Sequence, residues 1–193
     1  MGEKRYLVFD VETAGLRGRA FAVGYVVVDE GGGEVSAGWG TCGLRSVPCR
    51  PDDTAWIIDN IPTEVVFPRS GGNEFLDRTA MIEWFCRVVA DSKADLAADC
   101  GYPCEVSWLK ECGIKAYPLH EIATALLMAR RDPVGTYDRL ENELPKHHPL
   151  ADARQSARIL LECLRAVGAV GSKEVQIPGF SIPGPWHASS EAT

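Results

Sequence analysis

Two acidic residues at the end of a short apolar run are the first candidates for chemistry. Residues 5–11 are rich in aromatic side chains and valine, which predicts a buried strand. Alternate side chains of a strand share a face, so Val8, Asp10 and Glu12 point the same way. Adjacent buried carboxylates repel each other and lose hydration, and a divalent cation with hard oxygen ligands removes that conflict. A metal site is one interpretation, and a strand that simply reaches solvent at Asp10 is the other.

A second group of candidates lies near the other end of the chain. A helix is predicted over residues 150–167, because Pro149 suits its first turn and Gly168 suits its end. Asp152 falls in the first turn of this helix, and His147 lies in the loop before it. An acid in a first turn often only complements the helix dipole, and a histidine in a loop is usually just exposed. Taken alone, neither residue indicates a site.

Together, the two segments resemble a known family. The run Asp10–Leu16 (DVETAGL), followed much later by His147–Arg154 (HHPLADAR), resembles the first and third motifs of the DEDDh 3′–5′ exonucleases. This ribonuclease H-like family includes proofreading exonucleases and oligoribonuclease. The predicted hairpin at residues 21–35 is also similar to one in the family, and the resemblance spans roughly residues 5–167.

The resemblance implies a reaction and a set of site residues. It implies hydrolysis of phosphodiester bonds from the 3′ end of single-stranded RNA or DNA, with release of nucleoside 5′-monophosphates. The cofactors would be two Mg²⁺ or Mn²⁺ ions, and His147 would take the proton of the attacking water. The implied metal ligands, which are also counted as catalytic, are Asp10, Glu12, Glu105 and Asp152. The implied substrate-binding residues are Thr13, Gly15 and Leu16, with Leu16 as a wedge against the terminal base.

Two positions of the family pattern have competing candidates. The middle motif normally carries an aspartate, whereas this chain has Glu105 at the matching spacing, and Asp99 is the alternative ligand. A glutamate is one methylene longer and still reaches a metal, so Glu105 is preferred on register. His148 has the spacing of a sister subclass, but that subclass uses tyrosine there, and His147 is therefore the chosen base.

Composition argues against several other classes of protein. The chain has 193 residues and a formal net charge of −7, which argues against a nucleic-acid binder that works by bulk positive charge. Its 7 cysteines contain no C-x-x-C pair, so free thiols in a reducing compartment are preferred to a zinc site. The apolar stretch at residues 6–9 is too short for a signal peptide or a membrane span. We therefore expect a cytoplasmic protein with no membrane partner.

The elements that must position these residues form an α/β domain. A mixed five-stranded sheet flanked by helices, ribonuclease H-like, is expected over residues 1–170, followed by an extended or disordered tail at 171–193. Residues 42–73 read as irregular structure with a short helix near 63–66, and together with Trp39 and Trp56 they are candidates for a homodimer interface. The other expected elements are strands at 21–28, 34–41 and 93–98, helices at 74–90 and 105–112, and a strand end leading into a helix at 118–129.

Two rival functions fit the same sequence. The substitution of glutamate for aspartate at position 105 suits a catalytically weakened module that still binds nucleic acid or a protein partner. The same carboxylates also suit another metal-dependent phosphatase or nuclease. Release of mononucleotides from a 3′ end, as opposed to internal fragments or free phosphate, distinguishes these functions.

Overall fold

One mixed sheet forms the centre of the protein. The computed structural model describes residues 4–69, 74–99, 103–115, 119–122, 125, 144–166, 168, 176–177 and 180–181. The sheet has the strand order β3-β2-β1-β4-β5. Its strands are β1 (Arg5–Thr13), β2 (Ala20–Asp29), β3 (Glu34–Thr41), β4 (Asp95–Ala98) and the three-residue β5 (Leu119–Glu121).

Strand β1 occupies the middle of the sheet, as its apolar sequence predicts. It pairs antiparallel with β2 and parallel with β4. The side chains of Leu7, Val8 and Phe9 are fully buried, which is typical of a strand covered on both faces. The mixed α/β class is confirmed, and the hairpin of β2 and β3 lies where the two apolar runs predict it.

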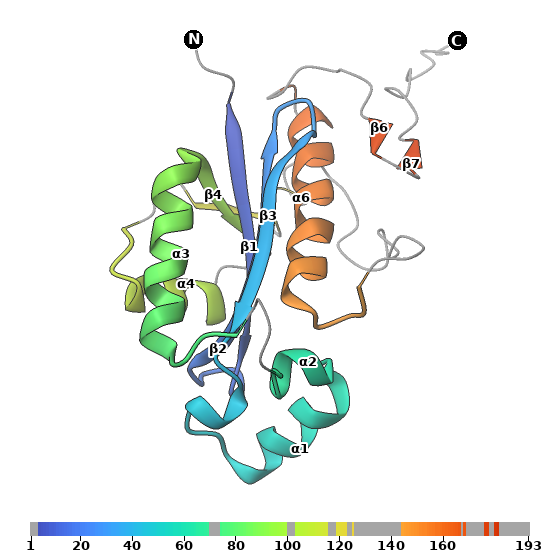
Figure 1. Ribbon diagram of the computed structural model, residues 1–193. Coiled ribbons are helices and arrows are strands. Elements are labelled where there is room, and N and C mark those ends of the chain that lie inside the picture. Colours follow the sequence, from blue (N-terminus) through green and yellow to red (C-terminus); the bar gives the residue numbers. More distant parts are fainter. Residues whose placement is uncertain are drawn as a thin grey trace, which may run out of the picture.

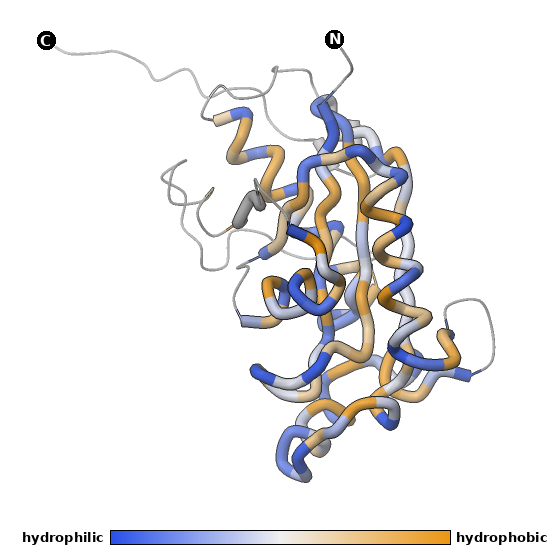
Figure 2. Tube along the Cα trace, turned by 90° about the vertical axis from the view of Figure 1, so that its left-hand side faces the viewer, coloured by the Kyte–Doolittle hydropathy of each residue, from blue (hydrophilic) through white to orange (hydrophobic). Residues whose placement is uncertain are grey.

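Helices cover both faces of the sheet (Figure 1). Helices α3 (Arg78–Ser92) and α4 (Cys104–Glu111) lie on one face, and α6 (Pro149–Ala166) lies on the other. Side chains of β1 alternate between two apolar clusters, with Leu7 and Phe9 in the first and Tyr6 and Val8 in the α6 cluster. Figure 2 shows the apolar stretches running along the strands and the inner sides of these helices. The predicted alternation of β1 is therefore confirmed.

Helix α6 begins directly against the backbone of β2. A Cβ atom added to Gly24 would overlap the backbone of Pro149 and Leu150, so only glycine allows this close approach. Gly24 is also the residue of β2 that pairs with Asp10. The first turn of α6 is therefore held over the part of β1 that carries the acidic residues.

The region between β3 and α3 differs from the prediction. Residues 51–60 form a regular helix, α1 (Pro51–Asn60), where irregular structure was expected. Pro51 at the first helical position, followed by Asp52 and Asp53 in the first turn, is a start signal that the many nearby prolines obscured. The short helix near 63–66 is confirmed as α2 (Thr63–Val66), after a single 3-10 turn at Leu44–Ser46. Both small helices lie below one end of the sheet (Figure 1).

Other predicted boundaries move by a few residues. Helix α3 starts at Arg78 because the Asp77 side chain accepts a hydrogen bond from the Ala80 amide and caps the helix, whereas Glu74 bridges to Thr41. The expected extended tail includes a two-stranded pair, β6 (Gln176–Ile177) with β7 (Phe180–Ser181). Most of the element expected at 118–129 lies outside the described residues.

None of the helices in the described part of the chain has both the length and the apolar character needed to cross a membrane.

Candidate active site

The ends of two parallel strands bring the first acids together. The register of β1 and β4 pairs Phe9 with Ala98, so Asp10 of β1 lies beside Asp99, the residue that follows the end of β4. Asp10 is half-buried on β1, and Glu12, two residues further on, is buried on the same face. This is the edge of the sheet at which side chains from parallel strands converge.

Helix α6 adds two further candidates from the opposite end of the sequence. The side chains of Glu12, His147 and Asp152 have ligand atoms that all lie within 4.8 Å of one another. Asp152 stands in the first turn of α6, and its amide donates a hydrogen bond to the His148 carbonyl. Thus the loop before the helix is tied to the first turn, and His147 is brought against the acids.

Helix α4 carries Glu105, the preferred candidate for the middle carboxylate. Glu105 lies in the first turn of α4 and is buried, whereas the side chain of Asp99 is exposed. Glu12 Oε1 and Glu105 Oε2 are buried, and neither has a hydrogen-bond partner among the described residues. Ionised carboxylates in that state are costly unless they take up a proton or bind a cation. The donor set of carboxylate oxygens fits Mg²⁺ or Mn²⁺.

Mutual repulsion and burial perturb the titration of these acids. Burial, followed by the charge of Glu105, raises the pKa of Glu12 to about 8. Burial and the neighbouring carboxylates of Glu12, Glu105 and Asp99 raise the pKa of Asp10 well above its ordinary range. Burial and the charge of Asp99 raise the pKa of Glu105. A cation would relieve the shifts of Asp10, Glu12 and Glu105 at once.

The loop after β1 forms a tight turn beside the acids. The Thr13 hydroxyl donates to the Gly15 carbonyl (2.9 Å), and Gly15 has a φ of 83°, which favours glycine. Cys104, the first residue of α4, fastens this turn to the helix that carries Glu105. Its thiol donates to the Leu16 carbonyl (3.5 Å) and lies 3.6 Å from the Thr13 hydroxyl.

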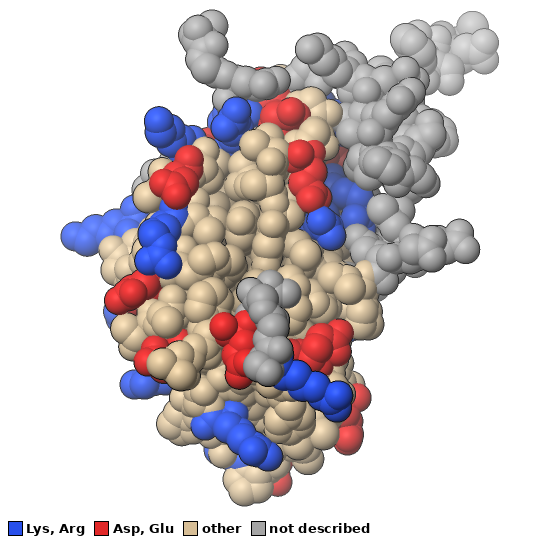
Figure 3. Space-filling model, viewed as in Figure 1, with Lys and Arg blue, Asp and Glu red and all other residues tan. Residues whose placement is uncertain are grey.

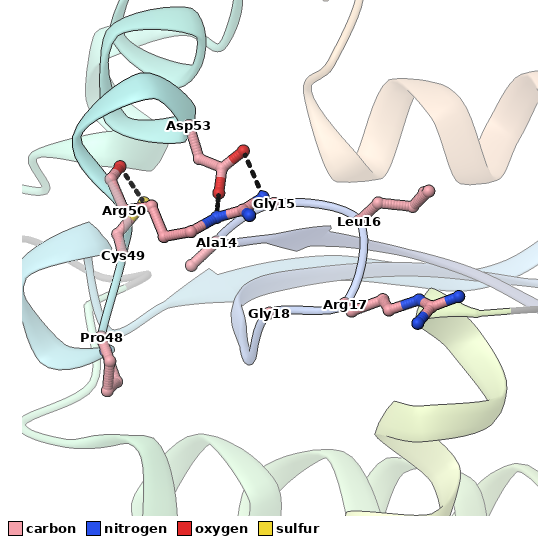
Figure 4. Close-up of a pocket in the computed structure, with 9 residues that line it drawn as sticks. All are labelled: Ala14, Gly15, Leu16, Arg17, Gly18, Pro48, Cys49, Arg50 and Asp53. Carbon is pink, nitrogen blue, oxygen red and sulfur yellow. Dashed lines mark hydrogen bonds and ion pairs between the residues drawn. The ribbon is translucent and has the colours of Figure 1, made fainter.

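A groove of about 560 Å³ runs between this turn and α1 (Figure 4). Leu16 lines the groove, and 70% of its surface is exposed. On the opposite wall Asp53 lies against Gly15 and accepts hydrogen bonds from Arg50 at 2.7 and 3.3 Å. The residues that line the groove are Ala14, Gly15, Leu16, Arg17, Gly18, Pro48, Cys49, Arg50 and Asp53.

The two adjacent histidines lie in different surroundings. His148 is buried, and its ring contacts Trp39 with 4.7 Å between ring centroids. His147 is half-buried beside Glu12 and Asp152, and its ring contacts Trp56 with 5.3 Å between centroids. From the sequence, both tryptophans were predicted only as candidates for a homodimer interface. Nothing in the sequence pairs Trp56 with His147, because the helix that presents Trp56 was not predicted.

Two other residues near the motifs have structural roles. Trp108 of α4 is buried and packs against Phe85. Arg154, the last residue of the third motif, forms a two-pronged ion pair with Glu34 of β3 at 2.8 and 3.0 Å. Figure 3 shows acidic side chains gathered across the lower middle of the face it presents, with basic side chains directly below.

Comparison with solved structures supplies the fold of this chain. S. pombe Pop2p, in a form with Mg²⁺ and Mn²⁺ bound, matches with a TM-score of 0.55 and 12% identity over 85% of this chain and 84% of that one. Exonuclease X, in complex with 5′ overhanging duplex DNA, matches with a TM-score of 0.50 and 18% identity over 84% and 93%. Exonuclease I from Methylocaldum szegediense matches with a TM-score of 0.61 and 14% identity. This chain has the ribonuclease H-like fold that these proteins share.

The extent of the likeness differs between these proteins. The chain covers most of Pop2p and Exonuclease X, but the match spans 40% of Exonuclease I while covering 84% of this chain. No family model matches the sequence, and no curated protein matches it. The resemblance seen in two short motifs is thus confirmed at the level of the fold. The overall sequence identity to these three proteins is only 12–18%.

Proposed function

We propose that this protein is a metal-dependent 3′–5′ exonuclease that degrades single-stranded nucleic acid to nucleoside 5′-monophosphates. The observation that carries the proposal is the convergence of Glu12, His147 and Asp152, from opposite ends of the sequence, on a fold shared with exonucleases. Residues that serve only stability have no reason to gather charged groups of the same sign beside a histidine.

The metal ions would be held by the four carboxylates of Asp10, Glu12, Glu105 and Asp152. The unpartnered oxygens of Glu12 and Glu105 support this assignment. When bound, divalent ions supply positive charge that acidifies the attacking water and neutralises the leaving 3′ oxygen. Asp99, exposed beside Asp10, is suited to a supporting position.

His147 is the proposed general base. An imidazole ordinarily titrates near pH 6.5 and accepts a proton from water at neutral pH. The adjacent carboxylates of Glu12 and Asp152 stabilise the imidazolium that results. His148 cannot take this role, because its ring is buried against Trp39.

The groove beside Leu16 is the proposed site for the 3′-terminal nucleotides. Leu16 projects from the turn that follows the acids, and Arg17 and Arg50 line the same groove (Figure 4). The apolar side chain suits contact with a base, and the guanidinium of Arg17 suits contact with phosphates, whereas that of Arg50 is paired with Asp53. E. coli Exonuclease I has been solved in complex with a dT13 oligonucleotide, and Exonuclease X with 5′ overhanging duplex DNA.

A digestion assay tests the proposal. RNA and DNA oligonucleotides, single- and double-stranded and labelled at either end, are incubated with Mg²⁺ or Mn²⁺. We expect mononucleotides from the 3′ end of single strands, and none after chelation of the metal. Binding without release of nucleotides would instead identify a non-catalytic module, and internal fragments or free phosphate would identify a different hydrolase.

A further inference from the structure

The ring of Trp56 contacts the ring of His147 edge to face. The two centroids are 5.3 Å apart, and the planes meet at 73°, which is a favourable arrangement of aromatic rings. Trp56 projects from α1 with 51% of its surface exposed, so its ring is not part of the buried core. Its contact with His147 is therefore not explained by the packing of a core.

His147 adopts an uncommon backbone conformation. Its φ is 61°, in the left-handed region that residues with a Cβ atom populate sparsely. This conformation turns the chain between the preceding loop and Pro149, the first residue of α6. It also allows His147 to face the acids while His148 is buried on the other side. A side chain on such a turn keeps one orientation only where its surroundings fix it.

We propose that Trp56 is a positioning residue for His147. The indole forms one wall against the imidazole, and Glu12 and Asp152 lie within reach of its nitrogen atoms. The inference rests on the proposed function, because it assumes that His147 accepts the proton of the attacking water. It assigns α1, an element absent from the sequence prediction, a role in orienting the base.

The contact predicts a particular pattern of kinetic effects. If Trp56 orients His147, its removal lowers kcat about tenfold and leaves KM nearly unchanged, since the loss of one ring contact corresponds to about that factor. Trp56→Phe retains a ring edge and should keep kcat within about threefold of the wild type. Ile58→Ala is the matched control, because Ile58 is similarly exposed on the same helix but lies about 200° around it.

A chemical measurement tests the contact without relying on catalysis. Diethyl pyrocarbonate acylates accessible imidazoles, and mass spectrometry of the peptide that holds both histidines reports each of them. In the metal-free protein we expect His147 to be acylated at least about threefold faster in Trp56→Ala than in the wild type. The Trp56→Phe and Ile58→Ala variants should resemble the wild type. His148 is buried and serves as the unreactive internal control.

The outcomes separate the two proposals. A wild type that releases no mononucleotides under any condition overturns the proposed function, whatever the acylation shows. An active wild type with equal His147 acylation and equal kcat in Trp56→Ala overturns the role of Trp56. A rise in KM alone, with kcat and acylation unchanged, also overturns it, because Trp56 would then contact substrate and not the base. Faster acylation together with lower kcat, both restored by phenylalanine, supports it.

Discussion

The contact between β1 and α6 has two halves with opposite chemistry. In the first half, Tyr6 and Val8 are buried against Leu160 and its apolar neighbours on α6. In the second half, the same face of the same strand carries Asp10 and Glu12 against the first turn of α6. Two residues along the strand are enough to change an apolar interface into a cluster of acids.

The apolar half of this contact contributes to folding, whereas the acidic half does not. The apolar half stabilises the protein by removing hydrocarbon from water, at about 25 cal/mol per Å². The acidic half works against folding, since burial and repulsion raise the pKa of Glu12 and of Asp10. A sequence selected for stability alone would continue the apolar pattern. The acids are therefore best explained by a ligand of positive charge.

The largest expected effect comes from the acidic half. Glu12→Gln keeps the shape of the side chain but removes the charge. We expect the rate of nucleotide release to fall by at least about 10²-fold, because a group that binds the catalytic ions is lost. The metal-free variant should be at least as stable as the wild type, since a raised pKa is removed. Single-turnover digestion and thermal unfolding provide the two measurements, and a variant that is both active and less stable would contradict this account of Glu12.

The apolar half should respond in the opposite way. Leu160→Ala removes a fully buried side chain of α6. We expect a loss of about 2–5 kcal/mol in the free energy of unfolding, and a fall in Tm of roughly 4–20 °C. Below that transition the apparent Kd for Mn²⁺ should match the wild-type value. A large change in Mn²⁺ affinity in the folded variant would show that the two halves are not separable.

The junction of the two halves is Gly24. In Gly24→Ala, the added methyl group overlaps the backbone at the start of α6 and displaces the turn that carries Asp152. We expect a cost of about 1–3 kcal/mol in stability, accompanied by weaker Mn²⁺ binding. Gly113→Ala is the control for lost stability alone, because alanine is strained at its φ of 68° while the added methyl group meets no atom within 4 Å. Unfolding curves and Mn²⁺ titrations are measured for both variants. Unchanged Mn²⁺ binding in Gly24→Ala would contradict the claim that the position of the first turn of α6 matters for metal binding.

The pH dependence of metal binding should follow the raised pKa values. The pKa of Glu12 in the native protein is about 8, above its ordinary 4.5, so the native state holds a proton that the unfolded state releases. Glu12 therefore destabilises the metal-free protein progressively as pH rises from about 4.5 to about 8, and its own contribution is constant above that. Binding of a cation requires the ionised carboxylate, so the apparent Mn²⁺ affinity rises over this window, about tenfold per pH unit for each proton released. The Mn²⁺-induced rise in Tm should be larger near pH 8 than near pH 6, and the opposite order would contradict the assignment.

The smallest effect is expected at Asp99. Its side chain is exposed, whereas Glu105 is buried with an unpartnered oxygen. Asp99→Asn should change the rate of nucleotide release less than about threefold, while Glu105→Gln lowers it by about 10²-fold. Parallel digestion assays of the two variants give the comparison. The reverse ranking would make Asp99 the middle metal ligand.

The sequence predicted the parts of the fold whose patterns are local. The alternation of β1 fixes the face that carries Asp10 and Glu12, and the Pro149 start signal fixes the first turn of α6. It could not show that Gly24 lets that turn approach the sheet, because this depends on two elements meeting in space. Nor could it show the contact of Trp56 with His147, which needs both the missed helix α1 and the left-handed turn at His147.

Calorimetric titration of the protein with Mn²⁺ near pH 8, where protons compete less for Glu12 than at neutral pH, tests the central claim most directly. The wild type should bind Mn²⁺ saturably, and Asp10→Asn should weaken that binding at least about tenfold, while the folded Leu160→Ala variant binds as the wild type does. Absence of binding to the wild type, or equal binding by Asp10→Asn, would contradict the assignment of the acidic half of the β1–α6 contact as a metal site.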